Sequence, residues 1–489
     1  MFNVLCVTSG NNCAQVGILN GQTNEVDYGE TAPPTPTNDK DKSLPTAAEK
    51  LFIADLDKLR SVGVRGVMVD CWWGIVEAEG PGQYNWKGYD RLFSIVSDAG
   101  LDLHVVMSFH ACVKDVGDSV EIPLPNWVTV VGNQNPDIFY KDAGGNPDYE
   151  YLSLAVDNEP VLNGLTPLQV YYSFMLQFSK NMKKYFAKPD KKGIKRIEVG
   201  LGPCGELRYP AYRFPWSFHP PPPGVGEFQC YDKYMMKSWE DEATKQGLPI
   251  PCRMGPQTAG DYSSTPNQTQ FFRDKSKTQL VIDKKEINLT YGICYWDKYG
   301  KAFLTWYTKN LVDHGKRVLQ TAKRIFQSEV EIAAKVPGIH WWYDTDSHAA
   351  EATAGLFAGD PKDNVYVYRS IADTLKDLGA TFIFTCAEMT NAEQKNANAS
   401  CDPELLVQQV LQMVSSREVP IACENALPRY NKEAFARIQD VAAKNHIVCF
   451  TYLRLDGPLM EDKNFKEFGN FVGEMKALRI TSPQGATTS

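Results

Sequence analysis

Two glutamates stand where short apolar segments give way to turns. In RIEVGLGPCGELRYPAY (Arg196–Tyr212) an apolar run leads into a Gly/Pro turn, and Glu206 follows the turn. Glu424 follows the apolar run Val419–Cys423 and precedes Asn425. Two carboxylates at the ends of two strands are the minimum set of catalytic groups for hydrolysing a glycosidic bond. One gives a proton to the leaving group, and the other activates a water or attacks the sugar.

Other polar groups follow the remaining apolar runs, often beside aromatic residues. If the runs are parallel strands of a closed barrel, their carboxyl ends meet on one face and these groups line a common rim. The groups are Asp70 before Trp72 and Trp73, His110, Lys335 and His340 before Trp341 and Trp342, Thr385 and Glu388, and Arg454. A purely structural barrel would instead place small or capping residues at these positions.

Each of these residues also has a structural interpretation. Asp70 could cap a helix, His110 could be a satisfied buried histidine, and Lys335 could be a solvated strand end. At least one tryptophan of each pair is expected to be packing, and Glu388 is expected to support the loop that carries Thr385. Among the candidate site residues the ligand spacings HxxE and HxH are absent, and the chain has no CxxC, so we expect neither a metal nor another cofactor.

The composition of the 489-residue chain is that of an ordinary globular protein, 43% hydrophobic and 22% charged, with a formal charge of −8. This charge disfavours binding to nucleic acid or anionic membranes and is compatible with a neutral sugar. The twelve cysteines show no disulfide framework, and we expect buried, reduced thiols. Met1–Val16 lacks the features of a secretory signal, and no run reaches the roughly 18 apolar residues of a membrane span. We therefore expect a cytoplasmic monomer.

Eight short apolar runs are typical of strands, and helical patterns separate most of them. The predicted strands are Phe2–Val7, Gly66–Val69, Leu101–Phe109, Ile194–Val199, Val330–Val336, Thr381–Thr385, Val419–Cys423 and His446–Leu453. Runs that are apolar on both faces and are followed by crossover-length helices indicate a parallel sheet covered on both sides. Eight units favour an α/β fold of the (β/α)8 TIM-barrel type over an open sheet. No GxGxxG opens a helix after the first strand, which weakens the dinucleotide-binding alternative.

Periodic segments and capping residues predict the helices. They span Lys50–Val62, Tyr89–Ala99, Thr166 to about Phe186, Tyr231–Lys245, Lys301–Gln327, Tyr366–Leu378, Pro403–Ser415, Lys432–Lys444 and Phe465–Leu478. Long loop insertions are predicted at Ala111–Leu165 and Arg213–Tyr299. We expect residues 1–45 to form a strand and a polar tail, residues 46–480 to form one catalytic barrel, and residues 481–489 to form a short tail.

From about Thr46 to Leu478 the chain resembles the β-amylases of glycoside hydrolase family 14. GVMVDCWWGIVE (Gly66–Glu77) is similar to the family's second-strand motif, and MSFHACVKDVGD (Met107–Asp118) to its histidine and lid motif. GLGPCGELRYPAY (Gly200–Tyr212) is similar to the proton-donor motif, and GEFQCYDKY, GIHWWY, FTCAEM, ENALPRY and FTYLRL follow in family order. The resemblance implies exo-hydrolysis of α-1,4-glucosidic bonds in starch- or glycogen-type polysaccharides. It implies release of maltose from non-reducing ends, inversion of the anomeric carbon and no cofactor.

The resemblance makes Glu206 the general acid and Glu424 the general base. It places nine further residues around the bound glucose units: Asp70, His110, Asp118, Lys335, His340, Thr385, Asn425, Ala426 and Arg454. Asp70 is suited to holding hydroxyls of the terminal sugar, which would close one end of the site and enforce exo action. Because inversion needs room for a water, the two carboxyl groups are expected roughly 6.5–9.5 Å apart.

The lid motif departs from the family pattern. It has Val113 and Lys114 where the family has two glycines, and it retains Asp118. The loss of backbone freedom is expected to affect lid motion and substrate affinity but not the chemistry. Two alternatives stay open: a catalytically weak or inactive sugar-binding regulatory homologue, and a retaining glycosidase on the same barrel.

Overall fold

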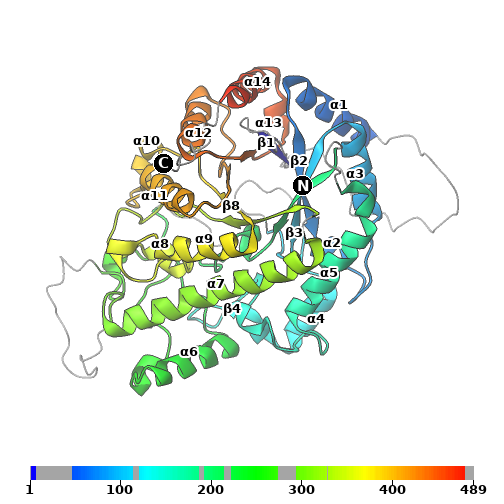
Figure 1. Ribbon diagram of the computed structural model, residues 1–489. Coiled ribbons are helices and arrows are strands. Elements are labelled where there is room, and N and C mark those ends of the chain that lie inside the picture. Colours follow the sequence, from blue (N-terminus) through cyan, green and yellow to red (C-terminus); the bar gives the residue numbers. More distant parts are fainter. Residues whose placement is uncertain are drawn as a thin grey trace, which may run out of the picture.

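The computed structural model describes residues 2–6, 47–113, 121–186, 192–213, 222–273, 293–327 and 329–478. Within these ranges eight strands form a closed barrel in the order β1-β10-β9-β8-β7-β6-β3-β2, with helices around it (Figure 1). The barrel strands are β1 (Phe2–Cys6), β2 (Gly66–Trp72), β3 (Asp102–Ser108), β6 (Ile194–Val199), β7 (Glu331–Val336), β8 (Thr381–Phe384), β9 (Ile421–Glu424) and β10 (Cys449–Tyr452). A separate hairpin contains β4 (Phe139–Lys141) and β5 (Pro147–Leu152).

Seven of the barrel strands run parallel to one another, as the sequence predicts. The first does not, because β1 lies antiparallel to both of its neighbours, with Phe2 opposite Val69 and Cys6 opposite Phe450. The prediction of eight parallel strands is therefore wrong for β1. A five-residue apolar run predicts a strand, but its pattern looks the same in either direction, so the sequence carried no information on its orientation.

Nine of the described helices match the predicted ones, and five shorter ones lie in segments where no helix was predicted. They are α1 (Ala47–Val62), α2 (Trp73–Val76), α3 (Lys87–Asp98), α4 (Asn126–Gln134), α5 (Pro167–Asn181), α6 (Lys233–Lys245), α7 (Lys298–Phe326), α8 (Ala349–Thr353), α9 (Tyr366–Leu378), α10 (Asn391–Gln394), α11 (Pro403–Ser416), α12 (Lys432–Asn445), α13 (Gly457–Met460) and α14 (Asp462–Ala477). Thr166 caps α5 with a capping box that involves Gln169. The helix ends at Asn181 rather than near Phe186, because the chain tightens into a 3-10 turn.

Helix α7 is the longest described element, and it packs between α5 and α9 (Figure 1). It contains no proline, and one of its faces is buried along most of its length. Its aromatic residues Phe303 and Tyr307 pack against Phe228, which belongs to the second long insertion. Helix α7 therefore joins the barrel to this insertion.

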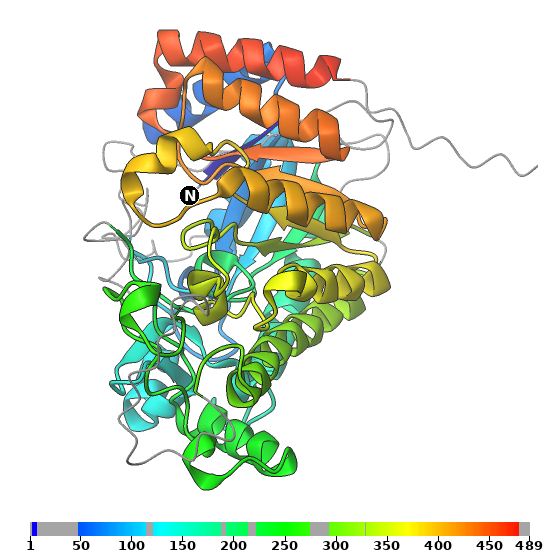
Figure 2. The same ribbon diagram turned by 90° about the vertical axis from the view of Figure 1, so that its left-hand side faces the viewer.

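The two long insertions lie together beside the barrel, as the cyan and green segments of Figure 2 show. The hydroxyl of Ser153 donates to Asp232 at 3.0 Å, and the Tyr231 amide donates to the carbonyl of Lys141 at 3.1 Å. These contacts join segments about eighty residues apart into one block at the edge of the barrel. Among the described helices, none has both the length and the apolar composition that crossing a membrane would require.

Candidate active site

The two glutamates lie at the carboxyl ends of parallel strands. Glu424 is the last residue of β9, and Glu206 follows a tight turn after β6. The turn is strained at Cys204, a non-glycine residue with a left-handed backbone (φ of 54°), and Gly205 follows it with φ of 74°, which glycine adopts readily. After the turn, the Leu207 amide donates to the carbonyl of Lys335 at 2.8 Å. The Glu206 loop, which we define as Gly200–Tyr209, is thereby fixed to the end of β7.

Lys335 interacts electrostatically with both predicted catalytic carboxyl groups. Its Nζ lies 3.5 Å from Oε2 of Glu424 and 3.4 Å from Oε1 of Glu198. Because β8 separates β7 from β9, the contact with Glu424 has to cross the barrel interior. Burial opposes the charge of Lys335, but Glu198, Glu424, Glu206 and Asp70 outweigh it and raise the lysine pKa.

Glu424 is fully buried. Burial raises the pKa of its carboxyl to about 7, Lys335 partly offsets this, and the negative charges of Glu198 and Glu206 add to it. Near neutral pH this carboxyl can therefore both hold and release a proton, which suits a group that must take a proton from water.

Glu206 is held differently from Glu424. Nε of Arg208 donates to Oε2 of Glu206 at 2.8 Å, and Nη2 of the same guanidinium lies 3.4 Å from the sulfur of Cys204. Cys204 is exposed and Cys112 is buried. The two predicted catalytic carboxyl groups thus have different partners, an arginine for Glu206 and a lysine for Glu424.

Beneath the rim lies a column of charged side chains that the sequence analysis missed. Glu198 of β6 is 3.3 Å from Nε2 of His104 on β3. Burial alone would raise the pKa of Glu198, but Lys335 and His104 outweigh it and lower that pKa to about 2. Deeper still, Arg196 donates to Glu331 at 2.9 Å. The signal was present, because Arg196 and Glu198 alternate within a run that was taken to be apolar.

Asp70 and His110 lie on the neighbouring strands of the same face. Asp70 is inside β2 rather than at its end, and it accepts a hydrogen bond from Ser108 at 2.8 Å. Burial raises its pKa, which Lys335 partly offsets. The ring of Trp72 meets His110 edge-on at 4.9 Å. Burial, with Lys335 and Arg208, lowers the pKa of His110 to about 3, so this imidazole is neutral.

At least one tryptophan of each pair is packing, as predicted, and all four are buried. Trp73 is fully buried and packs edge-on against Phe109, Trp127 and Tyr171. Its indole N–H donates to Glu77 at 2.6 Å. In the second pair, the indole of Trp341 donates to the hydroxyl of Tyr212.

The loops after β7 and β8 are tied to each other. The hydroxyl of Thr385 accepts a hydrogen bond from the Gly338 amide at 2.8 Å, and Nδ1 of His340 lies 3.4 Å from the Gly338 carbonyl. Burial lowers the pKa of His340. These contacts place the predicted sugar-binding residues Thr385 and His340 side by side.

Glu388 supports a different loop from the one expected. Its carboxylate accepts hydrogen bonds from the amides of Ala426 at 3.0 Å and Leu427 at 2.7 Å, so it fixes the loop after β9 rather than Thr385. The side-chain amide of Asn425 donates a hydrogen bond to the carbonyl of Leu453, just after β10, and accepts one from the Leu453 N–H. The side chain of Asn425 thus joins the loop after β9 to the end of β10.

The remaining predicted residues are one buried arginine and one aspartate. Arg454 is buried and follows β10 on the same face. Asp118 lies outside the described residues, as does Lys114. The two backbone hydrogen bonds between Cys112 and Ile122 join the described ends of this segment. Across the part of the chain that the structure describes, no group of three or more His, Cys, Asp or Glu side chains could hold a metal ion.

A cavity of about 460 Å³ is separate from this site. Its walls include Phe272, Trp342, Tyr343, Asp346 and His348, and none of the predicted site residues lines it. The Trp342 and Tyr343 rings are buried in the wall rather than presented to the space. The cavity therefore offers no evident stacking surface for a sugar.

Curated relatives match most of the chain. It is 45% identical over 434 residues to "Beta-amylase 2, chloroplastic" of Arabidopsis thaliana, which covers 87% of this chain and 75% of that protein. It is 43% identical over 437 residues to "Beta-amylase Tri a 17" of Triticum aestivum, which covers 87% of this chain and 81% of that protein.

Solved structures agree with the fold. The catalytic domain of β-amylase from Paenibacillus polymyxa superposes with a TM-score of 0.68 at 27% identity, covering 88% of this chain and 96% of that one. A β-galactosidase from Halorubrum lacusprofundi, at a TM-score of 0.50 and 11% identity over 87% of this chain and 56% of that one, shares the fold alone.

The predicted cytoplasmic location is wrong by comparison with these relatives. Matching proteins from Arabidopsis thaliana and from Oryza sativa are named chloroplastic, which points to a plastid. The prediction rested on the missing apolar core of a secretory signal. Because plastid leaders are amphipathic and rich in serine, that criterion cannot separate cytoplasm from plastid.

The strongest comparison covers nearly the whole barrel. The model of the family described as "Glycosyl hydrolase family 14" matches residues 45–479, which include all the described strands except β1. With the relatives above, this match shows that the chain belongs to glycosyl hydrolase family 14.

Proposed function

We propose that the chain removes maltose from the non-reducing ends of α-1,4-glucans with inversion, with Glu206 as general acid and Glu424 as general base. Family membership makes it a glycoside hydrolase of β-amylase type. One observation carries the assignment of roles. Two carboxylates from the ends of β6 and β9 act on one buried cation, Lys335, on the face where parallel strands end.

Glu424 has the surroundings of a general base. It is sealed from solvent, and Lys335 favours its ionised form while burial opposes it. Because these two effects oppose each other, the carboxyl group is partly ionised near neutral pH, and its ionised form can take the proton of an attacking water. Inversion requires that water to fit between the two carboxyl groups. The separation of roughly 6.5–9.5 Å that this implies between them stays a prediction.

Glu206 has to deliver a proton to the leaving sugar. In the free protein its carboxyl group is held by Arg208, whose Nε lies 2.8 Å from Oε2. The pair therefore has to loosen when the glucan binds. Hydrogen bonds in a free enzyme often rearrange in the substrate complex, so the pairing does not oppose the role. We assign Arg208 to holding Glu206 in place until the substrate enters.

The surrounding residues are suited to a neutral sugar. Neutral His110 can donate one hydrogen bond and accept another, as sugar hydroxyls require. Asp70 holds hydroxyls of the terminal glucose, and Lys335, His340, Thr385, Ala426 and Arg454 bind the following units, together with Asp118. In our proposal Asn425 contributes to the site by holding the backbone of Leu453 in place.

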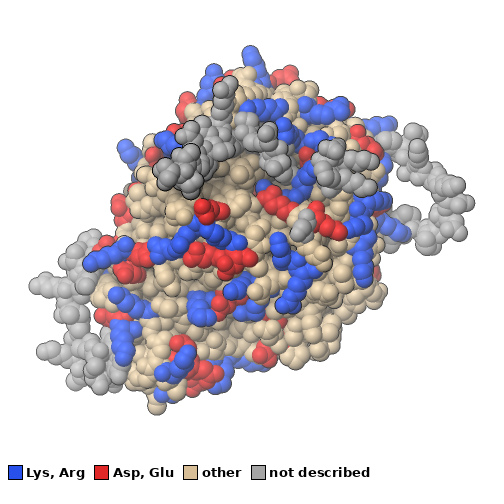
Figure 3. Space-filling model, in the orientation of Figure 1, with Lys and Arg blue, Asp and Glu red and all other residues tan. Residues whose placement is uncertain are grey.

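The protein acts on its glucan as a monomer in our proposal, without nucleic-acid or membrane partners. On the face shown in Figure 3, lysine and arginine side chains are interspersed with aspartate and glutamate. Such mixing provides no extended basic surface for a polyanion. Light scattering of the purified chain measures the oligomeric state directly.

Product analysis on soluble starch tests the proposal. The wild-type protein should release maltose as its first and dominant product, and NMR of the fresh product should show the β anomer. A ladder of oligosaccharides, or the α anomer, would reject the assignment. Glu206→Gln and Glu424→Gln should each lower turnover by about 10²- to 10⁴-fold. Binding of maltose without any hydrolysis would select the regulatory alternative, which no observation so far favours.

A further inference from the structure

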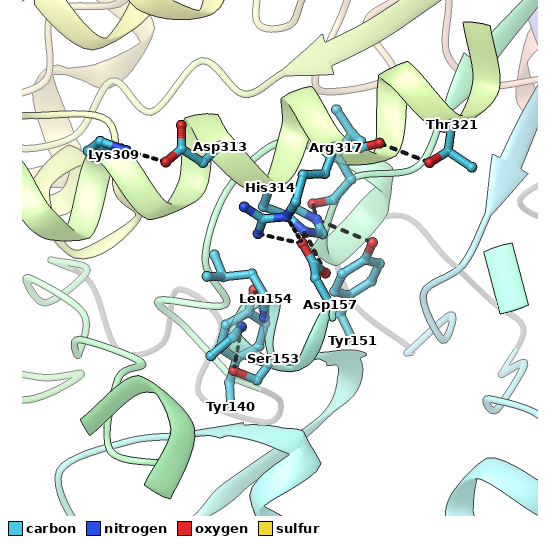
Figure 4. Close-up of polar contacts among 12 residues, drawn as sticks. Tyr140, Tyr151, Ser153, Leu154, Asp157, Lys309, Asp313, His314, Arg317 and Thr321 are labelled. Carbon is cyan, nitrogen blue, oxygen red and sulfur yellow. Dashed lines mark hydrogen bonds and ion pairs between the residues drawn. The ribbon is translucent and has the colours of Figure 1, made fainter. Parts of the chain in front are cut away.

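A buried histidine on α7 contacts the loop that carries Glu206. Nδ1 of His314 lies 2.8 Å from Oδ2 of Asp157, and Nε2 lies 3.1 Å from the carbonyl oxygen of Leu201 (Figure 4). Leu201 stands in the turn five residues before Glu206. The His314 side chain is almost fully buried, so water cannot replace either contact.

Both nitrogens of His314 have polar partners. The Asp157 carboxylate faces Nδ1, and the Leu201 carbonyl faces Nε2. The hydroxyl of Tyr151, 3.5 Å from Nε2, can accept a hydrogen bond from the ring or donate one to it. Contacts on both sides of the ring therefore fix its orientation between the first insertion and the Glu206 loop.

Asp157 is itself held by a second residue of α7. Arg317, one turn further along the helix, donates to the same carboxylate at 2.6 and 2.9 Å. The rings of Tyr151 and His314 meet edge-on (Figure 4). The cluster thus joins α7 to the first insertion through one buried carboxylate.

The same stretch of α7 contacts the Glu206 loop at two more points. The ring of Tyr307 stacks on Tyr209 at 3.8 Å, and the hydroxyl of Tyr209 donates to the Tyr307 carbonyl at 2.9 Å. Gly315 lies under Leu207, where an added Cβ would come within 3.1 Å of both methyl groups. Residues 307, 314 and 315 follow helical spacing, so they share one face of α7.

The loop needs such anchors because its turn is strained. Cys204 is a non-glycine residue with a left-handed backbone, a conformation that persists only when its surroundings hold it. The amide of Leu201 donates to the Gly205 carbonyl at 3.3 Å, which closes the turn just before Glu206. Fixing the Leu201 carbonyl therefore fixes the base of this turn.

We propose that His314, oriented by Asp157, is a positioning residue for Glu206 that fixes its loop through the Leu201 carbonyl. This inference rests on the proposed role of Glu206. His314 does not touch the substrate, and it acts by limiting where the Glu206 carboxyl can lie. Misplacement of a reacting group by about 1 Å can cost on the order of 100-fold in rate.

Asp157→Asn separates charge from shape. Asparagine fills the same space but replaces the carboxylate beside Nδ1 with an uncharged amide, which should loosen the ring and hence its hold on the Leu201 carbonyl. We expect kcat on maltooligosaccharides to fall about 10- to 100-fold, with KM changed less than about threefold. His314→Gln keeps an N–H that can reach the Leu201 carbonyl and should recover more kcat than His314→Leu. Equal kcat in these two variants, or an unchanged kcat in Asp157→Asn, would overturn the proposal.

A matched control separates positioning from stability. Phe326→Leu lies near the end of α7, where the ring packs against Phe178 and Phe186 rather than the Glu206 loop. It should lower the melting temperature but leave kcat unchanged at temperatures well below unfolding. If Phe326→Leu and Asp157→Asn lose kcat in proportion to their loss of stability, His314 has only a structural role and the proposal fails.

One readout does not depend on turnover. Hydrogen exchange at residues 201–207 should accelerate in Asp157→Asn but not in Phe326→Leu. Unchanged exchange in Asp157→Asn would refute the inference. A wild-type protein that releases no maltose would reject the proposed function but leave this test in force.

Discussion

Replacing Glu424 by glutamine should abolish maltose release and, above pH 7, make the fold more stable. The carboxyl of Glu424 has a pKa of about 7 in the folded protein, against 4.5 for an ordinary glutamate. The difference of about 2.5, at 1.36 kcal/mol for each pH unit, corresponds to about 3 kcal/mol. This is the free energy by which burial opposes the ionised carboxylate that the chemistry requires.

The sign of the effect depends on pH. In the unfolded chain the carboxyl loses its proton as the pH rises past about 4.5, whereas the folded protein keeps the proton until about pH 7. The wild-type protein therefore loses stability between these two pH values and does not regain it above them. Glutamine carries no such penalty. The stability difference should be close to zero at pH 4.5 and reach about 3 kcal/mol above pH 7. Lys335 keeps Glu198 as a partner in the variant.

Urea unfolding of both proteins at four pH values from 5 to 8 measures this difference. Glu206→Gln is the matched control, because Glu206 is paired with Arg208 at the rim and its replacement leaves the guanidinium without that partner. The control should be equally or less stable than wild type at every pH. A difference for Glu424→Gln that stays constant from pH 5 to 8, or a less stable variant at pH 8, would refute the reasoning.

Three further predictions concern neighbours of the catalytic pair. Lys335→Met removes the cation 3.5 Å from Glu424; it should raise the pKa of Glu424 further and move the acidic limb of the kcat/KM profile to higher pH, and an unmoved limb would contradict this. Glu388→Gln can accept fewer hydrogen bonds from the Ala426–Leu427 backbone; KM for maltooligosaccharides should rise several-fold, and initial-rate kinetics showing an unchanged KM would reject this role. Alkylation of exposed Cys204 should inhibit the enzyme, and Cys204→Ala should protect it; inhibition that persists in the variant would place the reactive thiol elsewhere.

Most of the barrel was predictable because its patterns are local. Strands buried on both faces appear as apolar runs, and helices such as α9 and α11 show their period and caps directly in the sequence. The direction of β1 was not predictable, because pairing with β2 and β10 is a long-range choice. The partner of Glu388 was missed for the same reason. Its contacts are with residues almost forty positions away.

The rim residues were accessible to sequence reasoning, and the column beneath them was not. Glu206 and Glu424 follow apolar runs at turns, which is a visible signal. Glu198 and His104 sit inside such runs, and their importance depends on contacts across neighbouring strands. Charged residues within a predicted barrel strand therefore indicate a second layer of the site.

The charged column also constrains how the strands can align as the barrel forms. In β6, Arg196 lies opposite His104 and Glu331, and a bulge that skips one residue is needed to reach this alignment with β3. A slip of one residue would turn Arg196 and Glu198 out of the barrel, so that Glu331 would lose Arg196 and Lys335 would lose Glu198. Such misaligned forms cost far more than a slip between aliphatic strands would. The residues beneath the active site thus fix the register of the strands and exclude wrong pairings before any substrate is present.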